Sequence, residues 1–297
     1  DSIRRQRQMC IRDSTYHESI QLLRDHGLQP LQIPMDNDGL MLDALAERLE
    51  DLDKRRVRSG SGPRKRPLLL YVIPNFQNPS GITLVAERRR PLLALAERHN
   101  LLLIEDDVYR DLAYEGTVPP SLFALDGGRR VLRIGSFSKI LAPGVRLGWL
   151  MGPDDHIRRL IGSGLRCMGG GANPLVANTL AEYCRQRRLE KHIAHLQGVY
   201  RERRDAMLAA LEKHMPPGVS WTQPSGGCFV WLSLPDRLRA TEIAEQARQA
   251  KLMIPVGDPF FAETPTGQHL RLAFSYVAPE EIKDGIVILG RILRFES

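Results

Sequence analysis

The chain has 297 residues, of which 42% are hydrophobic and 26% charged, and this composition excludes a disordered or fibrous protein. No apolar run approaches the roughly 18–20 residues of a membrane span, and the polar N-terminal residues do not predict a signal peptide. The net charge of +7 would suit nucleic-acid binding, but many of the basic residues flank a Ser/Gly-rich stretch within 54–66. Because no aromatic residues alternate with them, we expect a solvated loop.

The four cysteines lie far apart and form no Cys-x-x-Cys pair, which favours reduced thiols in a cytoplasm. His192 and His195 share one helix face, but no acid or cysteine is arranged with them, so we expect no metal site.

Residues 1–14 have no regular period and predict a loosely attached leader. The run 9–14 (MCIRDS) also looks like translated sequencing-adapter DNA. We therefore hypothesise that the natural chain is interrupted before Thr15, which resequencing the locus would test.

From Thr15 onward, short apolar strands alternate with helices. This pattern is typical of βαβ units, so we expect an α/β fold with a mostly parallel sheet between helices in a large domain over 15–176. The expected helices are 16–26, 40–52 and 84–99, the last kinked or broken at Pro91, and the expected strands are 28–34, 68–73, 101–105 and 131–135.

The pattern changes after Met151, and three glycines at 169–171 predict a hinge. A smaller α+β domain is expected over 177–297. After Met151 we expect helices at 154–165, 174–215, 240–250 and 279–294, and strands at 227–234, 252–256 and 269–275.

Ligands of open parallel sheets bind outside the carboxyl ends of the strands, and the first such end leads to Asn78. The following Pro79 holds Asn78 extended, so its amide can point into a cleft. The alternative is a simple Asn-Pro turn.

The second strand ends in the acidic run 105–107. A semi-buried acid there needs a cationic partner, such as a protonated pyridine nitrogen, and Tyr109 would offer its hydroxyl to the same ring. The alternative is an acid that caps the next helix.

The third strand runs into a turn that presents Lys139, and a Pro-Gly break then returns Arg146 towards it. A lysine is a nucleophile only when its amine loses its proton. This arrangement suits a carbonyl cofactor that bears a phosphate, with Lys139 holding the aldehyde as a Schiff base and Ser136, Ser138 and Arg146 binding the phosphate. The alternative is a surface lysine in a polar turn.

Together these segments resemble fold-type-I pyridoxal-phosphate enzymes, in particular class I/II aminotransferases and the similar domain of MocR-type regulators. Asn-Pro-x-Gly at 78–81, Asp-x-x-Tyr at 106–109, Ser-x-x-Lys at 136–139 and the trailing Arg146 occur in family order. The resemblance covers nearly the whole chain from Thr15 and implies pyridoxal 5'-phosphate as the cofactor.

The resemblance also implies catalytic roles for Lys139, Asp106 and Tyr109. Lys139 would hold the cofactor and move the proton between the substrate Cα and the cofactor, and Asp106 would pair with the pyridinium nitrogen. Asn78 and Tyr109 would bind the ring 3-oxygen. The further implied contacts are Tyr16 against the ring face, Ser136, Ser138 and Arg146 on the phosphate, and Arg271 with Asn78 at the substrate.

Family members carry more chain before the position of Tyr16, including a Gly/Ser-rich turn whose helix binds the phosphate. Residues 1–14 do not resemble that turn. We therefore expect a large domain that is incomplete at its N-terminus and a phosphate site that lacks one wall.

The implied activity is transamination between an amino acid and a 2-oxo acid, in amino-acid metabolism or biosynthesis, by a cytoplasmic homodimer. Two alternatives stay open. One is the amine-sensing domain of a MocR-type regulator, which would contact nucleic acid only through an upstream DNA-binding domain. The other is a lyase or decarboxylase on the same scaffold.

Overall fold

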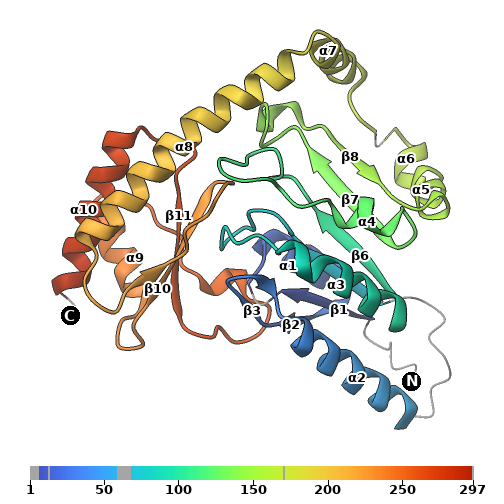
Figure 1. The fold of residues 1–297 in the computed structure, drawn as a ribbon, viewed down its shortest axis with the longest axis horizontal. Coiled ribbons are helices and arrows are strands. Elements are labelled where there is room, and N and C mark those ends of the chain that lie inside the picture. The colour runs from blue at the N-terminus through green and yellow to red at the C-terminus, as the bar shows by residue number, and fades with distance from the viewer. Residues whose placement is uncertain (1–6, 13, 59–67, 170, 296–297) are drawn as a thin grey trace.

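The computed structural model describes residues 7–12, 14–58, 68–169 and 171–295, and within them a six-stranded sheet forms the centre (Figure 1). Its strand order is β2-β1-β5-β6-β7-β8. The first five strands run parallel, and β8 pairs antiparallel with β7. The prediction of a mostly parallel sheet is therefore confirmed. The strands are β1 (Arg7–Arg12), β2 (Leu28–Ile33), β5 (Leu68–Val72), β6 (Leu101–Asp106), β7 (Val131–Ser136) and β8 (Gly148–Met151).

The prediction of a loosely attached leader is wrong for residues 7–12, which form β1 between β2 and β5. Met9, Cys10 and Ile11 are each at most 1% exposed. The apolar stretch is only three residues long between polar neighbours, so it carried too little pattern to predict a strand. Residues 1–6 and 13 lie outside the described residues, and the adapter hypothesis stays a hypothesis.

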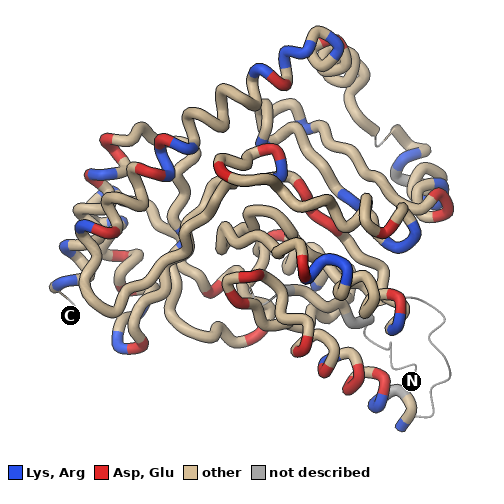
Figure 2. The backbone as a smooth tube through the Cα atoms, in the orientation of Figure 1, with Lys and Arg blue, Asp and Glu red and all other residues tan. Residues whose placement is uncertain are grey.

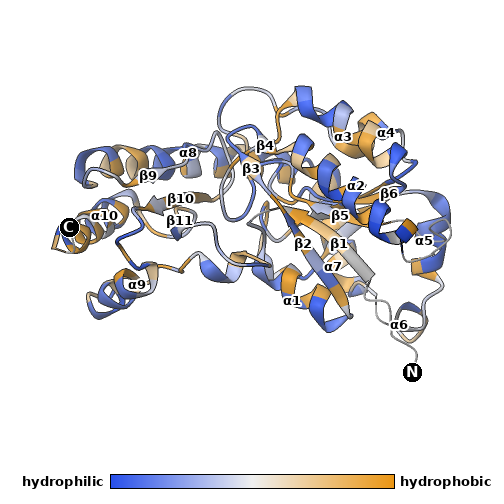
Figure 3. Cartoon of the chain, turned by 90° about the horizontal axis from the view of Figure 1, so that it is seen from below, coloured by the Kyte–Doolittle hydropathy of each residue, from blue (hydrophilic) through white to orange (hydrophobic). Residues whose placement is uncertain are grey.

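Helices cover both faces of the sheet, as Figure 3 shows from a second direction. The helices α2 (Leu42–Arg58), α3 (Ala86–Arg98) and α4 (Leu122–Asp126) share one apolar cluster with Cys10, Leu70 and Leu103. The opposite face carries α1 (His17–Asp25), whose Ile20 packs in the cluster of Met9, Ile11 and Tyr71. Neighbouring residues of a strand point to opposite faces, which is why Leu70 and Tyr71 belong to different clusters.

Two sequence-based expectations about the first half change in the structure. Helix α2 continues to Arg58, so residues 54–58 belong to a helix rather than to the predicted loop, and 59–66 lie outside the described residues. Helix α3 runs through Pro91 without a break. The two short strands β3 (Met35–Asp36) and β4 (Gly39–Leu40) pair antiparallel with each other before α2.

The second half is built around a three-stranded sheet of order β11-β10-β9 (Figure 1). The predicted strand 252–256 is wrong: only Val256 forms an isolated bridge, to Leu270, because Pro255 has no N–H to donate to a ladder. Of the predicted glycine hinge, Gly170 lies outside the described residues. Besides β8, the helices and strands that follow β7 are η1 (Pro143–Val145), α5 (Asp154–Ile161), α6 (Gly164–Cys167), α7 (Pro174–Arg185), α8 (Arg188–His214), β9 (Ser220–Trp221), β10 (Phe229–Leu234), α9 (Ala240–Gln249), η2 (Asp258–Phe260), β11 (Gln268–Ala273) and α10 (Pro279–Phe295).

One apolar cluster joins the two halves. It contains Met9 and Ile11 of β1 together with Leu270 of β11 and Leu289 of α10. The division at residue 176 stays a prediction. Figure 2 shows charges of both signs on the outer helices α2, α8 and α10. Among the helices of the described residues, none is at once long and apolar enough to cross a membrane.

Candidate active site

The carboxyl ends of β5, β6 and β7 lie side by side, because these strands are neighbours in the sheet. Side chains from the segments after these ends meet there. Arg271 of β11 donates from Nη1 to Asn78 Oδ1 over 2.9 Å. The Nζ atom of Lys139 lies 5.9 Å from the centre of the Tyr109 ring. A hydrogen bond between Asn78 and Tyr109 is among the influences on the pKa of Tyr109. The structure thus brings four predicted residues, Asn78, Tyr109, Lys139 and Arg271, into one site.

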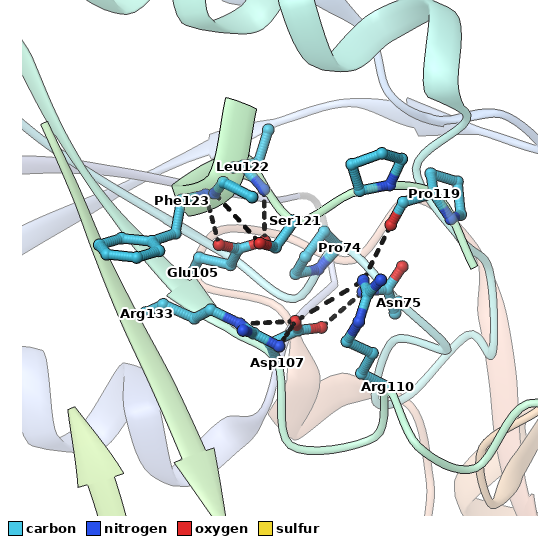
Figure 4. Close-up of polar contacts among 12 residues, drawn as sticks. Pro74, Asn75, Glu105, Asp107, Arg110, Pro119, Ser121, Leu122, Phe123 and Arg133 are labelled. Carbon is cyan, nitrogen blue, oxygen red and sulfur yellow. Dashed lines mark hydrogen bonds and ion pairs between the residues drawn. The ribbon is translucent and has the colours of Figure 1, made fainter. Parts of the chain in front are cut away.

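The three consecutive acids of the predicted motif have three different surroundings. Glu105 and Asp107 point to one face of the sheet and Asp106 to the other, as the period of a strand requires. The fully buried carboxylate of Glu105 accepts from the N–H groups of Leu122 and Phe123, 2.8 and 2.9 Å away, at the start of α4 (Figure 4). The alternative of a helix-capping acid therefore holds for Glu105, and it leaves Asp106 for the site.

Asp106 has one satisfied oxygen and one free oxygen. Its Oδ2 accepts from the hydroxyl of Tyr71 over 2.5 Å, whereas its buried Oδ1 has no hydrogen-bond partner among the residues that the structure describes. Burial raises the pKa of Asp106, and repulsion by Asp107 adds to this, while the hydrogen bond from Tyr71 and the charge of Lys139 lower it. A buried carboxylate oxygen without a partner is costly, so this atom fits a cationic ligand group.

Asp107 holds the neighbouring loops in place rather than facing the site. Its carboxylate accepts from Arg133 Nε and Nη2 at 2.9 and 2.8 Å and from the side-chain amide of Asn75 (Figure 4). Arg110 lies 3.9 Å away. Because Asn75 precedes Asn78 by three residues, this buried ion pair anchors the loop that carries Asn78.

The loop of Asn78 fits only because residue 81 is a glycine. Gly81 has a φ of +73°, and a Cβ atom there would lie 2.7 Å from the carbonyl oxygen of Phe229. The loop therefore packs directly on the start of β10. Tyr109 is also buried, and burial raises its pKa above the ordinary range.

The predicted lysine turn is the connection between β7 and β8. Ser136 pairs with Gly148, and Phe137 donates its N–H to the carbonyl of Leu147, so the chain returns Arg146 beside the serines. The Ser136 hydroxyl accepts from the Ser138 N–H over 3.0 Å. Lys139 and Arg146 are exposed, and Arg146 adopts a left-handed φ of 47°. Two hydroxyls and a guanidinium at one turn can bind an anion such as a phosphate.

Arg271 lies between two aromatic rings, and no carboxylate of the described part of the chain forms an ion pair with it. Its guanidinium carbon is 4.5 Å from the ring centre of Phe229 and 4.8 Å from that of Phe260. Its Nε is buried and has no hydrogen-bond partner within the described ranges, and burial lowers the pKa of the side chain. A guanidinium in these surroundings is suited to a carboxylate ligand.

Tyr16 precedes α1 and is 36% exposed. Burial and then Glu18 and Asp106 raise its pKa, whereas Arg271 and Arg146 lower it. The phenol is therefore within electrostatic range of Asp106 and of the two arginines.

Three residues of this region were not predicted: Tyr71, Ser19 and Cys228. Tyr71 interrupts an aliphatic run, and that polar hydroxyl in a buried strand was the available signal. Cys228 is buried, and burial raises its pKa to about 12, while Lys139 and Arg271 act in the opposite direction. No signal in the sequence distinguished Ser19 from an ordinary helix residue.

Comparison with known proteins gives the class. The family model for aminotransferase class I and II matches residues 2–289, so the chain belongs to this family. It is 36% identical over 287 residues to aromatic-amino-acid aminotransferase 1 of Thermococcus litoralis, which covers 95% of this chain and 66% of that protein. It is 31% identical to the uncharacterised HTH-type transcriptional regulator YdfD of Bacillus subtilis, over 94% of this chain and 55% of the regulator.

Among solved structures, LysN, an α-aminoadipate aminotransferase from Thermus thermophilus, matches with a TM-score of 0.87 and 32% identity. That structure is complexed with N-(5'-phosphopyridoxyl)-L-leucine, and the match covers 98% of this chain and 72% of LysN. The resemblance seen in the motifs and the fold type of pyridoxal-phosphate transferases are thereby confirmed. The chain spans about two thirds of the length of the aminotransferases that it matches.

Proposed function

We propose that this protein is a pyridoxal-phosphate-dependent aminotransferase that moves an amino group between an amino acid and a 2-oxo acid. The observation that carries the proposal is the bare, buried Oδ1 of Asp106 in a site that also contains Lys139 and Asn78. A buried acceptor that has no hydrogen-bond partner among the described residues fits the protonated ring nitrogen of this cofactor. The names of the matched aminotransferases support the same reaction class.

The residues fit the cofactor group by group. Asp106 would accept from the ring nitrogen, Asn78 and Tyr109 would bind the 3-oxygen, and Tyr16 would cover the ring face. The phosphate would be held by the hydroxyls of Ser136 and Ser138 with the guanidinium of Arg146. When bound, pyridoxal phosphate supplies an aldehyde that joins to amines and a ring that withdraws electrons from the substrate Cα.

The chain's own contribution is orientation and proton transfer. The carboxylate of the amino acid would bind the guanidinium of Arg271, which presents an unpaired Nε, and Asn78 would fix the other end of that guanidinium. The Lys139 amine, once deprotonated, would remove the proton from the substrate Cα as a general base and later return it. The apolar rings of Phe229 and Phe260 would exclude water from the substrate carboxylate.

The test is the visible absorbance of the chain reconstituted with pyridoxal phosphate. We expect Lys139→Ala to abolish the absorbance of the lysine-bound cofactor, because no other amine would hold the aldehyde. Lys191→Ala, at an exposed position of α8, is the matched control and should keep it. A spectrum that is unchanged by Lys139→Ala would refute the proposal. Loss of this absorbance with a panel of amino acids would then identify the amino donor.

The second proposal is the alternative in which the same site binds an amine without turnover; the chain is also similar to a transcription regulator. The two proposals differ in product formation. A 2-oxo acid that appears in proportion to the amino acid consumed supports the enzyme, whereas cofactor-dependent amine binding without product supports the sensor. A DNA-binding domain encoded upstream would also support the sensor.

We also propose a cytoplasmic homodimer. The location rests on the cysteines, which form no disulfide among the described residues. The dimer rests on family resemblance alone, and light scattering of the purified protein tests it.

A further inference from the structure

The hydroxyl of Tyr71 connects a helix to the free carboxylate of the site. It accepts a hydrogen bond from Ser19 Oγ of α1 over 3.2 Å and donates one to Asp106 Oδ2 over 2.5 Å. An ionised carboxylate only accepts, so the Tyr71 hydrogen must point to Asp106 and leave its lone pairs for Ser19. The three side chains therefore form a relay of hydrogen bonds in which each group donates to the next, from Ser19 of α1 through Tyr71 of β5 to Asp106 of β6.

This relay decides which oxygen of Asp106 is left for a ligand. Tyr71 is 6% exposed and packs in the main apolar cluster, so its hydroxyl has little freedom to move. With Oδ2 held, the carboxylate cannot rotate without breaking the bond to Tyr71, and Oδ1 stays the oxygen that no described residue contacts by a hydrogen bond.

We propose that Tyr71 is a positioning residue for Asp106: its hydroxyl keeps the carboxylate ionised and directs Oδ1 to the cationic nitrogen of the ligand, and Ser19 orients that hydroxyl. This inference rests on the proposed function where it concerns the cofactor. The ionisation of Asp106 can be tested without it.

The charges around Asp106 show why such a donor matters. Burial and the neighbouring Asp107, the residue after β6, both raise the pKa of Asp106 and so disfavour its charged form. The hydrogen bond from Tyr71 is the strongest influence in the opposite direction, ahead of the N–H of Val108 and the charge of Lys139. The phenols of Tyr16 and Tyr109 also lie within electrostatic range of the carboxylate.

The first experiment titrates the carboxyl of Asp106 in the cofactor-free chain. Aspartate labelled with ¹³C at Cγ gives one NMR signal per residue, and the signal that disappears in Asp106→Asn belongs to Asp106. We expect the pKa of Asp106 to rise in Tyr71→Phe and to rise less in Ser19→Ala. Tyr114→Phe is the matched control, because Tyr114 is also buried but donates to the carbonyl of Gly227. An Asp106 pKa equal in wild type and Tyr71→Phe overturns the inference.

The second experiment measures cofactor affinity by absorbance. We expect the dissociation constant of pyridoxal phosphate to rise about tenfold or more in Tyr71→Phe, since a hydrogen bond to a charged group is lost. Tyr114→Phe should bind as wild type does. A purely structural role of Tyr71 would lower the denaturation midpoint and leave the Asp106 pKa unchanged, which overturns the inference.

The two proposals fail in different ways. If wild type does not bind pyridoxal phosphate, the proposed function fails, and the carboxyl titration still decides the role of Tyr71. If wild type binds and Tyr71→Phe matches it in both experiments, the function stands and the inference is overturned.

Discussion

The side-chain amide of Asn75 donates a hydrogen bond to Asp107, so the loop after β5 is tied to the end of β6. The other end of that amide accepts from the fully buried Arg89 over 2.7 Å. Arg89 also donates to the carbonyl of Leu84, and burial lowers its pKa to about 10. A network of buried charges therefore sets the position of the loop that carries Asn78.

We expect Asp107→Ala to destabilise the chain by about 3–5 kcal/mol, because it leaves the charge of Arg133 without its partner. Asp155→Ala, at an exposed position of α5, should change the free energy of unfolding by about 0.5 kcal/mol or less. Urea denaturation of the three chains measures both effects. Equal midpoints for Asp107→Ala and wild type would show that the network does not stabilise the fold.

We expect Gly81→Ala to be more destabilising than Gly27→Ala. Both glycines have a left-handed φ, +73° and +68°, which costs a non-glycine residue about 1–2 kcal/mol. A Cβ atom at Gly81 would also meet the carbonyl oxygen of Phe229 at 2.7 Å, whereas nothing lies within 4 Å at Gly27. Urea denaturation gives the free energy of unfolding of each variant. The difference between the two values measures the cost of this close approach, which we expect to be about 1–3 kcal/mol. Equal losses would rule out that contact.

We expect Arg271→Lys to raise KM for the amino acid about 10- to 100-fold, because an ammonium cannot bind a carboxylate through two parallel N–H groups. Arg203→Lys is the control: Arg203 donates to the carbonyl of Ser275, and no ligand contact is assigned to it. Steady-state kinetics with several amino acids measure the change. A KM that stays at the wild-type value would remove Arg271 from the substrate site.

We expect Asp106→Asn to stabilise the cofactor-free chain increasingly as pH rises. The folded pKa of Asp106 is raised by burial, so in wild type the folded state binds the proton more tightly than the unfolded state. Wild-type stability therefore falls as pH rises from the unfolded value of about 3.9 to the raised folded value, and asparagine removes this loss. Glu105 and Asp111, whose pKa values are also raised, are present in both chains and cancel. Denaturation midpoints at a series of pH values test this; a difference that is independent of pH would contradict it.

The sequence predicted most of the site because parallel strands bring their carboxyl ends to one edge. Asn78, Tyr109 and Lys139 follow three such ends, and the rule places them together without knowledge of any contact. Arg271 comes from a distant strand, and it was predicted from the family resemblance together with its place as an arginine within an apolar strand. The roles of these residues stay predictions until the variants are measured.

The parts that were missed have physical reasons. Strand β1 has a short apolar stretch, and burial on both sides by β2 and β5 depends on tertiary contacts that no local pattern reports. Helix α2 extends past its predicted end because Lys54 and Arg55 pair with Glu50 and Asp51 one turn earlier. The contact of Tyr71 with Asp106 joins adjacent strands across a face, which a linear reading does not rank above ordinary packing.

Met9 near one end of the chain and Leu289 near the other belong to a single apolar cluster. During synthesis, the ribosome releases the first of these long before the second. The apolar residues of the nascent sheet that belong to this cluster therefore lack their α10 partners until α10 emerges from the exit tunnel. Chaperones that bind exposed apolar segments can bind the chain during that interval.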